Sequence, residues 1–200
     1  TLTTSHPITF LGIEFQLRSN GDVFLNQRAF VREILHKHEA SKQKGLTAIT
    51  IDKLPTEPDV PTPKELKELQ GYSGEFNWLA TRTRPDMSYY TSVLASACSR
   101  YKKWAFTLAQ KILRFLIATS EQGILITRKG NLNELVAWTD AGFAGTDTKS
   151  QSGLVIIWGD SIIVWRSSRQ TVSALSTAEA ELNSAAVGWQ IVEGLSLIHI

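Results

Sequence analysis

The chain has 200 residues, of which 42% are hydrophobic and 20% charged, and its net charge at pH 7 is +2. This composition is typical of a globular protein of one or two domains with a buried core. The single cysteine, Cys98, excludes a disulfide framework and a cysteine-rich zinc site, and no apolar run reaches the ~18 residues of a transmembrane helix. We therefore expect no membrane partner. Because the chain begins at Thr1 and its only methionine is Met87, we expect it to be a piece of a longer protein.

The first 61 residues predict a β-hairpin, a helix and a loop. Apolar and β-branched residues over 7–17 indicate a strand, the Asn20-Gly21 pair indicates a turn, and VFLNQ (23–27) indicates the returning strand. Apolar positions at helical spacing predict a helix over 27–39. Residues 40–61 are polar and contain three prolines, which favours a linker or surface loop.

Three helices are predicted between residues 62 and 119. Thr62 is a good N-cap, Pro63 suits the first helical position, and Glu65 completes a capping box, so the first helix runs to about Thr81. A second helix opens at Pro85 and continues to about residue 100. The third covers about 103–119 and has a single apolar stripe.

Basic residues gather in this helical part of the chain. Between residues 82 and 116 the only acid is Asp86, whereas the basic residues are Arg82, Arg84, Arg100, Lys102, Lys103, Lys111 and Arg114. Such a local excess is typical of a face that contacts nucleic-acid phosphates. It is equally typical of a solvated helix surface, and composition alone leaves both interpretations open.

The last third changes to a pattern of three strands and a helix. Apolar, β-rich runs cover 134–139, 153–158 and 161–166, with a tight turn at Gly159-Asp160. A helix follows over 177–193, and its apolar positions recur at steps of three and four: Ala178, Leu182, Ala185, Trp189 and Val192. We expect this stripe to face the sheet. The β-β-β-α order indicates an α+β or mixed fold with the helix on one face.

Two acids in this region suggest a metal site. The first strand ends on Asp140, followed by small residues and glycines. On the helix, Glu181 lies about 60° from the centre of the apolar stripe, nearer the rim where helix meets sheet, and Glu179 lies about 100° away on the other side. Asp140 and Glu181 together are ligands that suit Mg²⁺. The alternative is that both are ordinary surface acids, since two carboxylates alone define no site.

Several long motifs follow one another along the chain and together resemble one known family. They are FLGIEF (10–15), LNQRAFVREIL (25–35), GEFNWLATRTRPDMSYYTS (74–92), AQKILRFLIATSEQGI (109–124), WTDAGFAG (138–145), KSQSG (149–153), VWRSSRQ (164–170) and LSTAEAEL (175–182). Over about residues 10–194 the chain resembles copia-type LTR retrotransposon Pol polyproteins, at the end of the reverse transcriptase and the beginning of the ribonuclease H. The resemblance implies an α+β fold, with a thumb/connection-like hairpin and helices followed by a truncated ribonuclease H-like β-β-β-α unit.

The resemblance also implies roles for single residues. Asp140 matches the family's first catalytic aspartate and Glu181 its catalytic glutamate, so both are expected to be catalytic and to bind metal. Glu179 is then a flanking, solvated acid. Gly142 stands where the family often has a second acid, and Asp147 is expected to be a turn residue.

The remaining motif residues are expected to pack or to contact nucleic acid. Trp165 is expected in the core, and Gln170 matches the last position of the family's W-x-S-x-x-Q run. The full set of expected nucleic-acid contacts is Arg82, Arg84, Lys102, Lys103, Lys111, Arg114, Arg166 and Arg169.

The implied cofactor is Mg²⁺ in a two-ion site, and the implied partners are an RNA/DNA hybrid or template–primer and the rest of the Pol polyprotein. The intact parent would act in cytoplasmic virus-like particles. The polymerase's Y-x-D-D motif and the D-N-x-x-A motif that carries the third ribonuclease H carboxylate are both absent from the sequence. We therefore expect incomplete sites and no activity of this chain alone. Two alternatives stay open: a non-catalytic nucleic-acid-binding remnant of a decayed or domesticated element, and a structural domain without a ligand.

The motifs divide the chain into four segments. Residues 1–61 are expected to be the palm/thumb-like end of the reverse transcriptase with a linker, 62–131 a helical connection-like module, and 132–194 a partial ribonuclease H-like domain. The end, LSLIHI (195–200), departs from the family pattern. Its codons can spell a transposase adaptor used in sequencing libraries, so we hypothesise a non-native, adaptor-derived tail.

Overall fold

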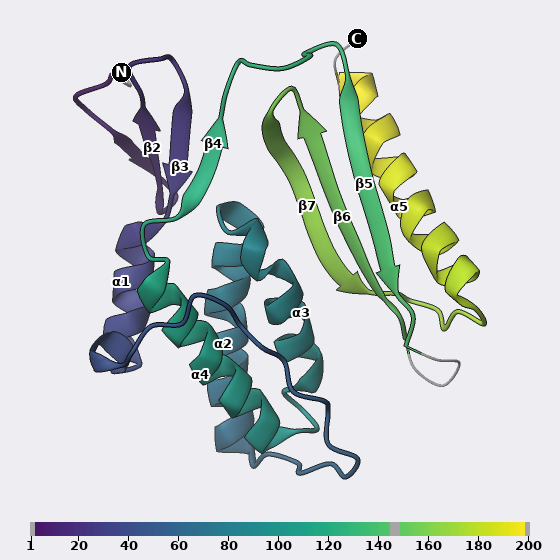
Figure 1. Ribbon diagram of the computed structural model, residues 1–200. Helices are drawn as coiled ribbons and strands as arrows, with labels where there is room; N and C mark the ends of the chain where they lie inside the picture. Colours follow the sequence, from purple (N-terminus) through teal and green to yellow (C-terminus); the bar gives the residue numbers. More distant parts are fainter. Residues whose placement is uncertain (1–2, 145–148, 199–200) are drawn as a thin grey trace. The chain divides into compact units, whose positions relative to one another are not determined.

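The computed structural model describes residues 3–144 and 149–198, without the side chain of Ile198. Within these residues it is a mixed α/β protein with five α-helices and two antiparallel sheets (Figure 1). The chain divides into two compact units. The first unit comprises Thr1–Gln16 and Phe24–Ile124, and the second comprises Leu17–Val23 and Leu125–Ile200. The segment boundaries expected after residues 61, 131 and 194 remain predictions.

The first unit begins with most of the predicted hairpin, of which Leu17–Val23 belongs to the second unit, and the hairpin is more finely divided than expected. The four-stranded sheet has the order β1 (Ile8–Phe10), β2 (Ile13–Leu17), β3 (Val23–Asn26) and β4 (Gly123–Ile126). A tight turn, with φ of 49° at Leu11 and 75° at Gly12, splits the single strand predicted over 7–17. The Asn20-Gly21 turn is confirmed, because Gly21 has a φ of 87° that favours glycine. The sequence did not predict β4.

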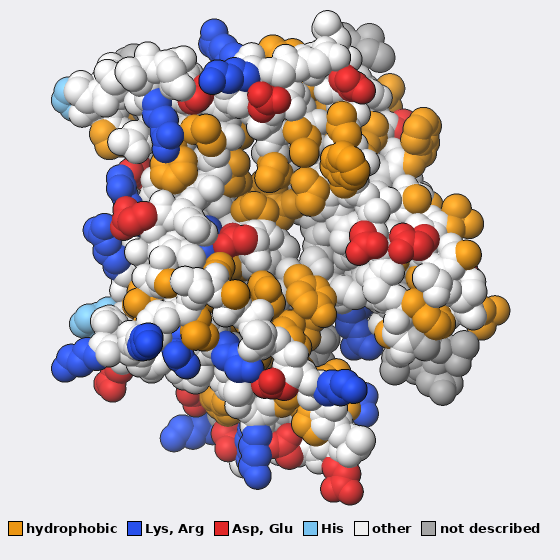
Figure 2. Space-filling view, viewed as in Figure 1, with side chains coloured by type: hydrophobic (Ala, Val, Ile, Leu, Met, Phe, Trp, Pro, Cys, Tyr) orange, Lys and Arg blue, Asp and Glu red, His pale blue; other side chains and the backbone are white. Residues whose placement is uncertain are grey.

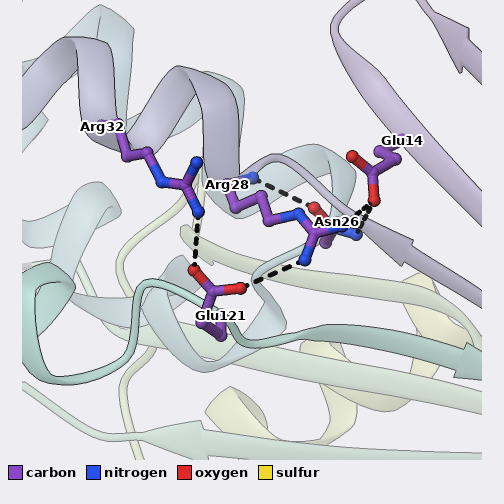
Figure 3. Close-up of polar contacts among 5 residues, drawn as sticks. All are labelled: Glu14, Asn26, Arg28, Arg32 and Glu121. Atoms are coloured by element: carbon purple, nitrogen blue, oxygen red, sulfur yellow. Dashed lines mark hydrogen bonds and ion pairs between the residues drawn. The ribbon is translucent and has the colours of Figure 1, made fainter.

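Charged side chains connect the hairpin to the helices of the first unit (Figure 3). Arg28, at the start of α1 (Arg28–Lys37), pairs with Glu14 of β2 and, at 3.2 Å, with Glu121, which follows α4. Arg32 contacts the same Glu121 carboxylate at 3.2 Å. The hydrogen bond from Arg28 lowers the pKa of Glu121. These contacts fix the start of α1 against two segments that are distant in sequence.

The helical part of the first unit follows the prediction closely. α2 (Pro63–Arg82) begins with the predicted capping box: Thr62 Oγ1 accepts from the Glu65 N–H, and the Thr62 N–H donates to Glu65 Oε2 at 2.8 Å. The helix expected from Pro85 is a 3₁₀ turn (Pro85–Met87) continued by α3 (Ser88–Ala97), and α4 spans Lys102–Ala118. Large apolar side chains from all four helices form one core, including Ile34, Phe76, Leu79, Leu94, Ile112 and Leu116.

The polar segment after α1 is a surface loop that packs against α4. It contains a short 3₁₀ turn (Ala40–Lys42) and the buried Ile49. The Leu46 N–H donates to the Arg114 carbonyl at 2.9 Å, and Trp104 Nε1 donates to the Asp52 carbonyl at 3.1 Å. The loop is therefore held to the first unit rather than being a free linker.

The second unit has the predicted β-β-β-α order. β5 (Leu135–Gly142), β6 (Gln151–Trp158) and β7 (Ser161–Arg169) form an antiparallel sheet in that order, and α5 (Thr177–Ile198) packs on it. The expected turn residue Asp147 lies outside the described residues. α5 contains residues 195–198 of the expected non-native tail, which does not test that hypothesis.

The face of α5 that packs on the sheet is not the predicted one. Ala180, Ser184 and Gly188 are buried, whereas Leu182 and Trp189 of the predicted stripe are 68% and 71% exposed. Figure 2 shows hydrophobic side chains at the surface over α5. The reason is close packing: a Cβ at Gly188 would lie 2.6 Å from Thr139 Cγ2, so only a face of small residues brings this helix so near the sheet.

Candidate functional site: carboxylates of the second unit and basic residues of both units

Asp140 lies near the end of β5, on an edge strand of the described sheet. Its neighbours Thr139 and Ala141 turn towards α5: Thr139 contacts the Gly188 position, and Ala141 is buried in a cluster with Ala180. Because side chains alternate along a strand, the Asp140 side chain starts on the opposite face, where it is exposed. In that position no described residue makes a hydrogen bond or ion pair with its carboxylate.

Glu181 lies on the first turns of α5, beside the same part of β5. Ser184 joins α5 to the sheet: its Oγ donates to the carbonyl oxygen of Asp140 in β5 at 2.9 Å and to that of Gly153 in β6 at 3.3 Å. Ser184 is three residues after Glu181, and Ala180, next to Glu181, is fully buried against the sheet. The helical turn that carries Glu181 is thus held against the strand that carries Asp140.

Gln170 holds the start of α5 in place, a role that the sequence motif alone did not reveal. Its Nε2 donates to Ser152 Oγ of β6 at 2.9 Å and to the Ala180 carbonyl at 2.8 Å, and the residue is buried. Gln170 therefore positions the residue immediately before Glu181.

Glu179, expected to be a flanking, solvated acid, also has a structural role that was not predicted. Its Oε2 accepts from the Leu175 N–H at 2.7 Å, while its own N–H donates to Ser176 Oγ at 3.1 Å. This is a form of the capping box at the start of α5, and the S-x-x-E spacing of residues 176–179 was the available signal. The two glutamates of this helix are thereby distinguished: Glu179 caps it, and Glu181 has no such partner among the described residues.

The donor chemistry of Asp140 and Glu181 fits a hard divalent cation, which prefers carboxylate oxygens. Two carboxylates are fewer ligands than such a site uses. Among the described residues no group of three or more His, Cys, Asp and Glu side chains lies together in a way that could hold a metal ion.

Arg84 is not available to nucleic acid, contrary to the prediction. It is 2% exposed, and its guanidinium contacts Asp86 at 2.8 Å, the Thr119 carbonyl at 3.0 Å and Thr119 Oγ1 at 2.7 Å. Its charge is thus used inside the first unit, where it joins the α2–α3 connection to the end of α4.

Three basic residues of α4 are also engaged within the first unit. Lys111 pairs with Asp52 at 2.7 Å, Lys102 pairs with Glu65 at 3.3 Å, and Arg114 Nε donates to the Lys44 carbonyl at 2.9 Å. Lys103 and Arg82 are exposed and pair with no carboxylate among the described residues. The basic cluster of the sequence is therefore mostly a set of internal contacts.

The two expected arginines of the second unit lie on β7 and are exposed. Their rows in the sheet differ. Arg169 pairs in register with Gln151, which is opposite Gly142, so alternation places Arg169 on the same face as Asp140. Arg166 is in the row of Leu154 and Thr139, on the face that carries α5. Of these two arginines, only Arg169 shares a sheet face with Asp140.

Curated proteins similar to this chain are Pol polyproteins of transposons. The chain is 31% identical over 189 residues to the retrovirus-related Pol polyprotein from transposon RE1 of Arabidopsis thaliana, and 31% identical over 181 residues to that from transposon RE2 of the same plant. Each match covers 88% of this chain and 12% of the polyprotein. An uncharacterized mitochondrial protein of Arabidopsis thaliana is 27% identical over 89% of the chain and 74% of its own length.

No protein-family model and no solved structure matches the chain. The order of the motifs and these similarities point to one class of protein. The homologues that match most of the chain are retrovirus-related Pol polyproteins of transposons, and the copia-type RE1 and RE2 polyproteins are among them. The chain spans about an eighth of the length of the first relatives that it matches. No helix in the described part of the chain is long and apolar enough to cross a membrane.

Proposed function

We propose that this chain is the segment of a retrotransposon Pol polyprotein in which the reverse transcriptase ends and the ribonuclease H begins. In the intact parent, the second unit supplies Asp140 and Glu181 to a Mg²⁺ centre that cleaves the RNA strand of RNA/DNA hybrids. The first unit contacts the template–primer. The parent acts in cytoplasmic virus-like particles, as the resemblance implies.

The observation that carries this proposal is the junction between β5 and α5. Ser184 bonds the backbone of Asp140 itself, and Gln170 bonds the residue before Glu181. Two buried polar residues thus anchor the backbone next to the two acids and leave both carboxylates without a described partner. Positioned and unpaired carboxylates are what a cation site requires.

When bound, Mg²⁺ would activate a water molecule and stabilise the charge that develops during phosphodiester cleavage. Asp140 and Glu181 would hold the metal. Arg169, on the face of Asp140, would contact a phosphate of the hybrid. Because the sequence provides two of the carboxylates, we expect the 200-residue chain alone to be inactive.

The test uses a longer polyprotein that contains this chain. Asp140→Asn and Glu181→Gln should each lower Mg²⁺-dependent cleavage of an RNA/DNA hybrid at least about 100-fold, because the loss of groups that only support a ligand already costs 10–100-fold. Glu179→Gln is the matched control, since glutamine also completes a capping box and should leave cleavage unchanged. Cleavage at the wild-type rate by Asp140→Asn would contradict the proposal.

A second experiment separates the catalytic proposal from the non-catalytic alternative. The purified 200-residue chain should release no product from the hybrid in Mg²⁺. Robust cleavage by this chain would show that our assignment of an incomplete site is wrong. Hybrid binding in the longer polyprotein together with no cleavage by the wild type would favour a non-catalytic nucleic-acid-binding remnant.

A further inference from the structure

The polar loop that precedes α2 runs along α4 from its last turn to its first (Figure 1). At the last turn, a Cβ at Gly45 would lie 3.0 Å from that of Ala118. At the first turn, the Lys102 N–H donates to the Asp59 carbonyl and the Lys103 N–H to Asp59 Oδ2, both at 3.0 Å. We call residues 43–59 the strap. Because each end is fixed on the helix, the strap stays beside the cations of α4.

Two of these cations are turned towards the strap. Lys111 Nζ lies 2.7 Å from Asp52 Oδ2 and 3.0 Å from the Thr50 carbonyl oxygen. Arg114 Nε donates to the Lys44 carbonyl at 2.9 Å. The Asp52 side chain is 66% exposed, so its ion pair with Lys111 lies at the surface, where such pairs are weak. The strap therefore holds the two cations without burying them.

A surface groove of about 380 Å³ lies on the same side of α4. Its lining is basic and polar around one aromatic ring, and it consists of Phe106, Thr107, Gln110, Lys111 and Arg114. Lysine, arginine, hydroxyl and amide side chains are the groups that contact the sugar–phosphate backbone of nucleic acids. None of the lining residues is an acid. The composition of the groove thus suits a polyanion.

Lys111 and Arg114 belong both to the groove and to the contacts with the strap. A lysine has three donors on a flexible stem, so its ammonium group can turn from one partner to another without a change in the helix. For Lys111 the strap supplies a carboxylate and a carbonyl oxygen, which are the kind of oxygen acceptors that a phosphate would supply. The strap thus occupies a cation that a ligand in the groove would need.

We propose that the strap restrains the binding of nucleic acid in the α4 groove, because Asp52 competes with a backbone phosphate for Lys111. The inference rests on the proposed template–primer role of the first unit. In the free chain Lys111 pairs with Asp52, and a phosphate has to displace this carboxylate. The contacts of the α4 cations within the first unit are then one of two alternative states of the same side chains.

The experiment measures the binding of the 200-residue chain to a fluorescently labelled RNA/DNA hybrid by anisotropy. Asp52→Asn should bind the hybrid about 2–5-fold more tightly than its charge-matched control, because loss of an exposed ion pair frees Lys111. The slope of log affinity against log salt should become steeper by about one phosphate contact. A merely structural contact would give the opposite sign or no change.

The matched control is Glu57→Gln. Glu57 lies in the same strap, is exposed and makes no ion pair among the described residues. Its replacement changes the net charge as Asp52→Asn does, so the general attraction of the chain for a polyanion rises equally in both variants. Circular dichroism checks that both remain folded.

A double-mutant cycle tests the role of Lys111. Lys111→Gln should lower the affinity more in the Asp52→Asn background than in the wild type, because only there is the ammonium group free to contact a phosphate. An equal loss in the two backgrounds would overturn the assignment of the competition to Lys111.

Two further outcomes overturn the inference in distinguishable ways. If the wild type binds the hybrid and Asp52→Asn binds no more tightly than Glu57→Gln, the strap does not compete and the proposed function stands. If neither the wild type nor Asp52→Asn binds the hybrid at low salt, the restraint by the strap and the template–primer role both fail.

Discussion

The two units of this protein bury hydrophobic surface in very different ways. The first unit has a continuous core in which large side chains from four helices, such as Phe76 and Leu116, are fully buried. Among the described residues of the second unit, the buried apolar side chains are fewer and mostly small: a cluster of three alanines, with Leu154 and Ile156 of β6, while Trp138, Leu182 and Trp189 are each more than 60% exposed. Hydrophobic stabilisation follows the apolar area removed from water. The comparison therefore predicts that the first unit is much the more stable of the two.

The largest effect that tests this difference comes from a pair of matched leucines. Leu116→Ala should destabilise the first unit by about 2–5 kcal/mol, because Leu116 is fully buried and its removal leaves a cavity. Leu182→Ala should change the stability of the second unit by less than about 0.5 kcal/mol, because Leu182 is 68% exposed. Amide hydrogen exchange, resolved by unit, measures both. A large loss of protection in Leu182→Ala would mean that the α5 stripe is buried and that the comparison is wrong.

A smaller effect concerns the packing of the second unit, which depends on small residues rather than on large ones. Gly188→Ala should cost about 1–3 kcal/mol, because its Cβ would lie 2.6 Å from Thr139 Cγ2 and the helix must shift away from the sheet. Gly194→Ala in the same helix should stabilise by up to about 1 kcal/mol, since its Cβ meets nothing. Thermal denaturation of the two variants gives the sign of each change. Equal stabilisation by both substitutions would show that α5 does not lie as close to the sheet as described.

The sequence predicts the helices and strands of this protein well where adjacent residues determine them. It predicts them poorly where packing or pairing with residues distant in the sequence determines them. The α2 capping box and the three strands of the second unit follow from adjacent residues. The packed face of α5 was mispredicted because α5 has apolar residues on one side and small residues on another, and the close approach to Thr139 selects the small ones. β4 escaped prediction because four residues after a helix show no clear alternation; pairing with β3 makes them a strand.

The candidate site shows the same division. Asp140 and Glu181 were predicted from their motifs and from helix geometry. Arg84 was predicted as a nucleic-acid contact because its burial depends on Thr119, 35 residues away in the sequence. The neighbouring sequence does not reveal that Ser184 and Gln170 hold α5 in place either, because each of their hydrogen bonds joins residues that only the fold brings together. Motifs thus indicate which residues could react, and only the fold tells which of them are free to do so.

The smallest expected effect compares the capping boxes with which each unit starts a helix, Thr62–Glu65 and Ser176–Glu179. Hydrogen bonds from the Thr62 N–H and then from the Thr62 hydroxyl lower the pKa of Glu65 below its usual 4.5. A carboxyl group whose pKa is lower in the folded state contributes stability above its unfolded pKa, and this contribution is lost as pH falls through the folded value. Fraying of α2 should therefore increase below about pH 4.5.

Thr62→Ala should raise the pKa of Glu65, because it removes the hydroxyl that donates to Oε2, and should leave α5 unaffected. An NMR titration of the glutamate side chains measures the pKa, and amide exchange in the first turn of each helix measures the fraying. Thr177→Ala, next to the N-cap of α5, serves as a control that keeps both boxes intact. An unchanged pKa of Glu65 in Thr62→Ala would show that the Thr62 hydroxyl is not a cause, and would leave the Thr62 N–H, which alanine keeps, and Lys102, whose amine is 3.3 Å from Glu65 Oε1.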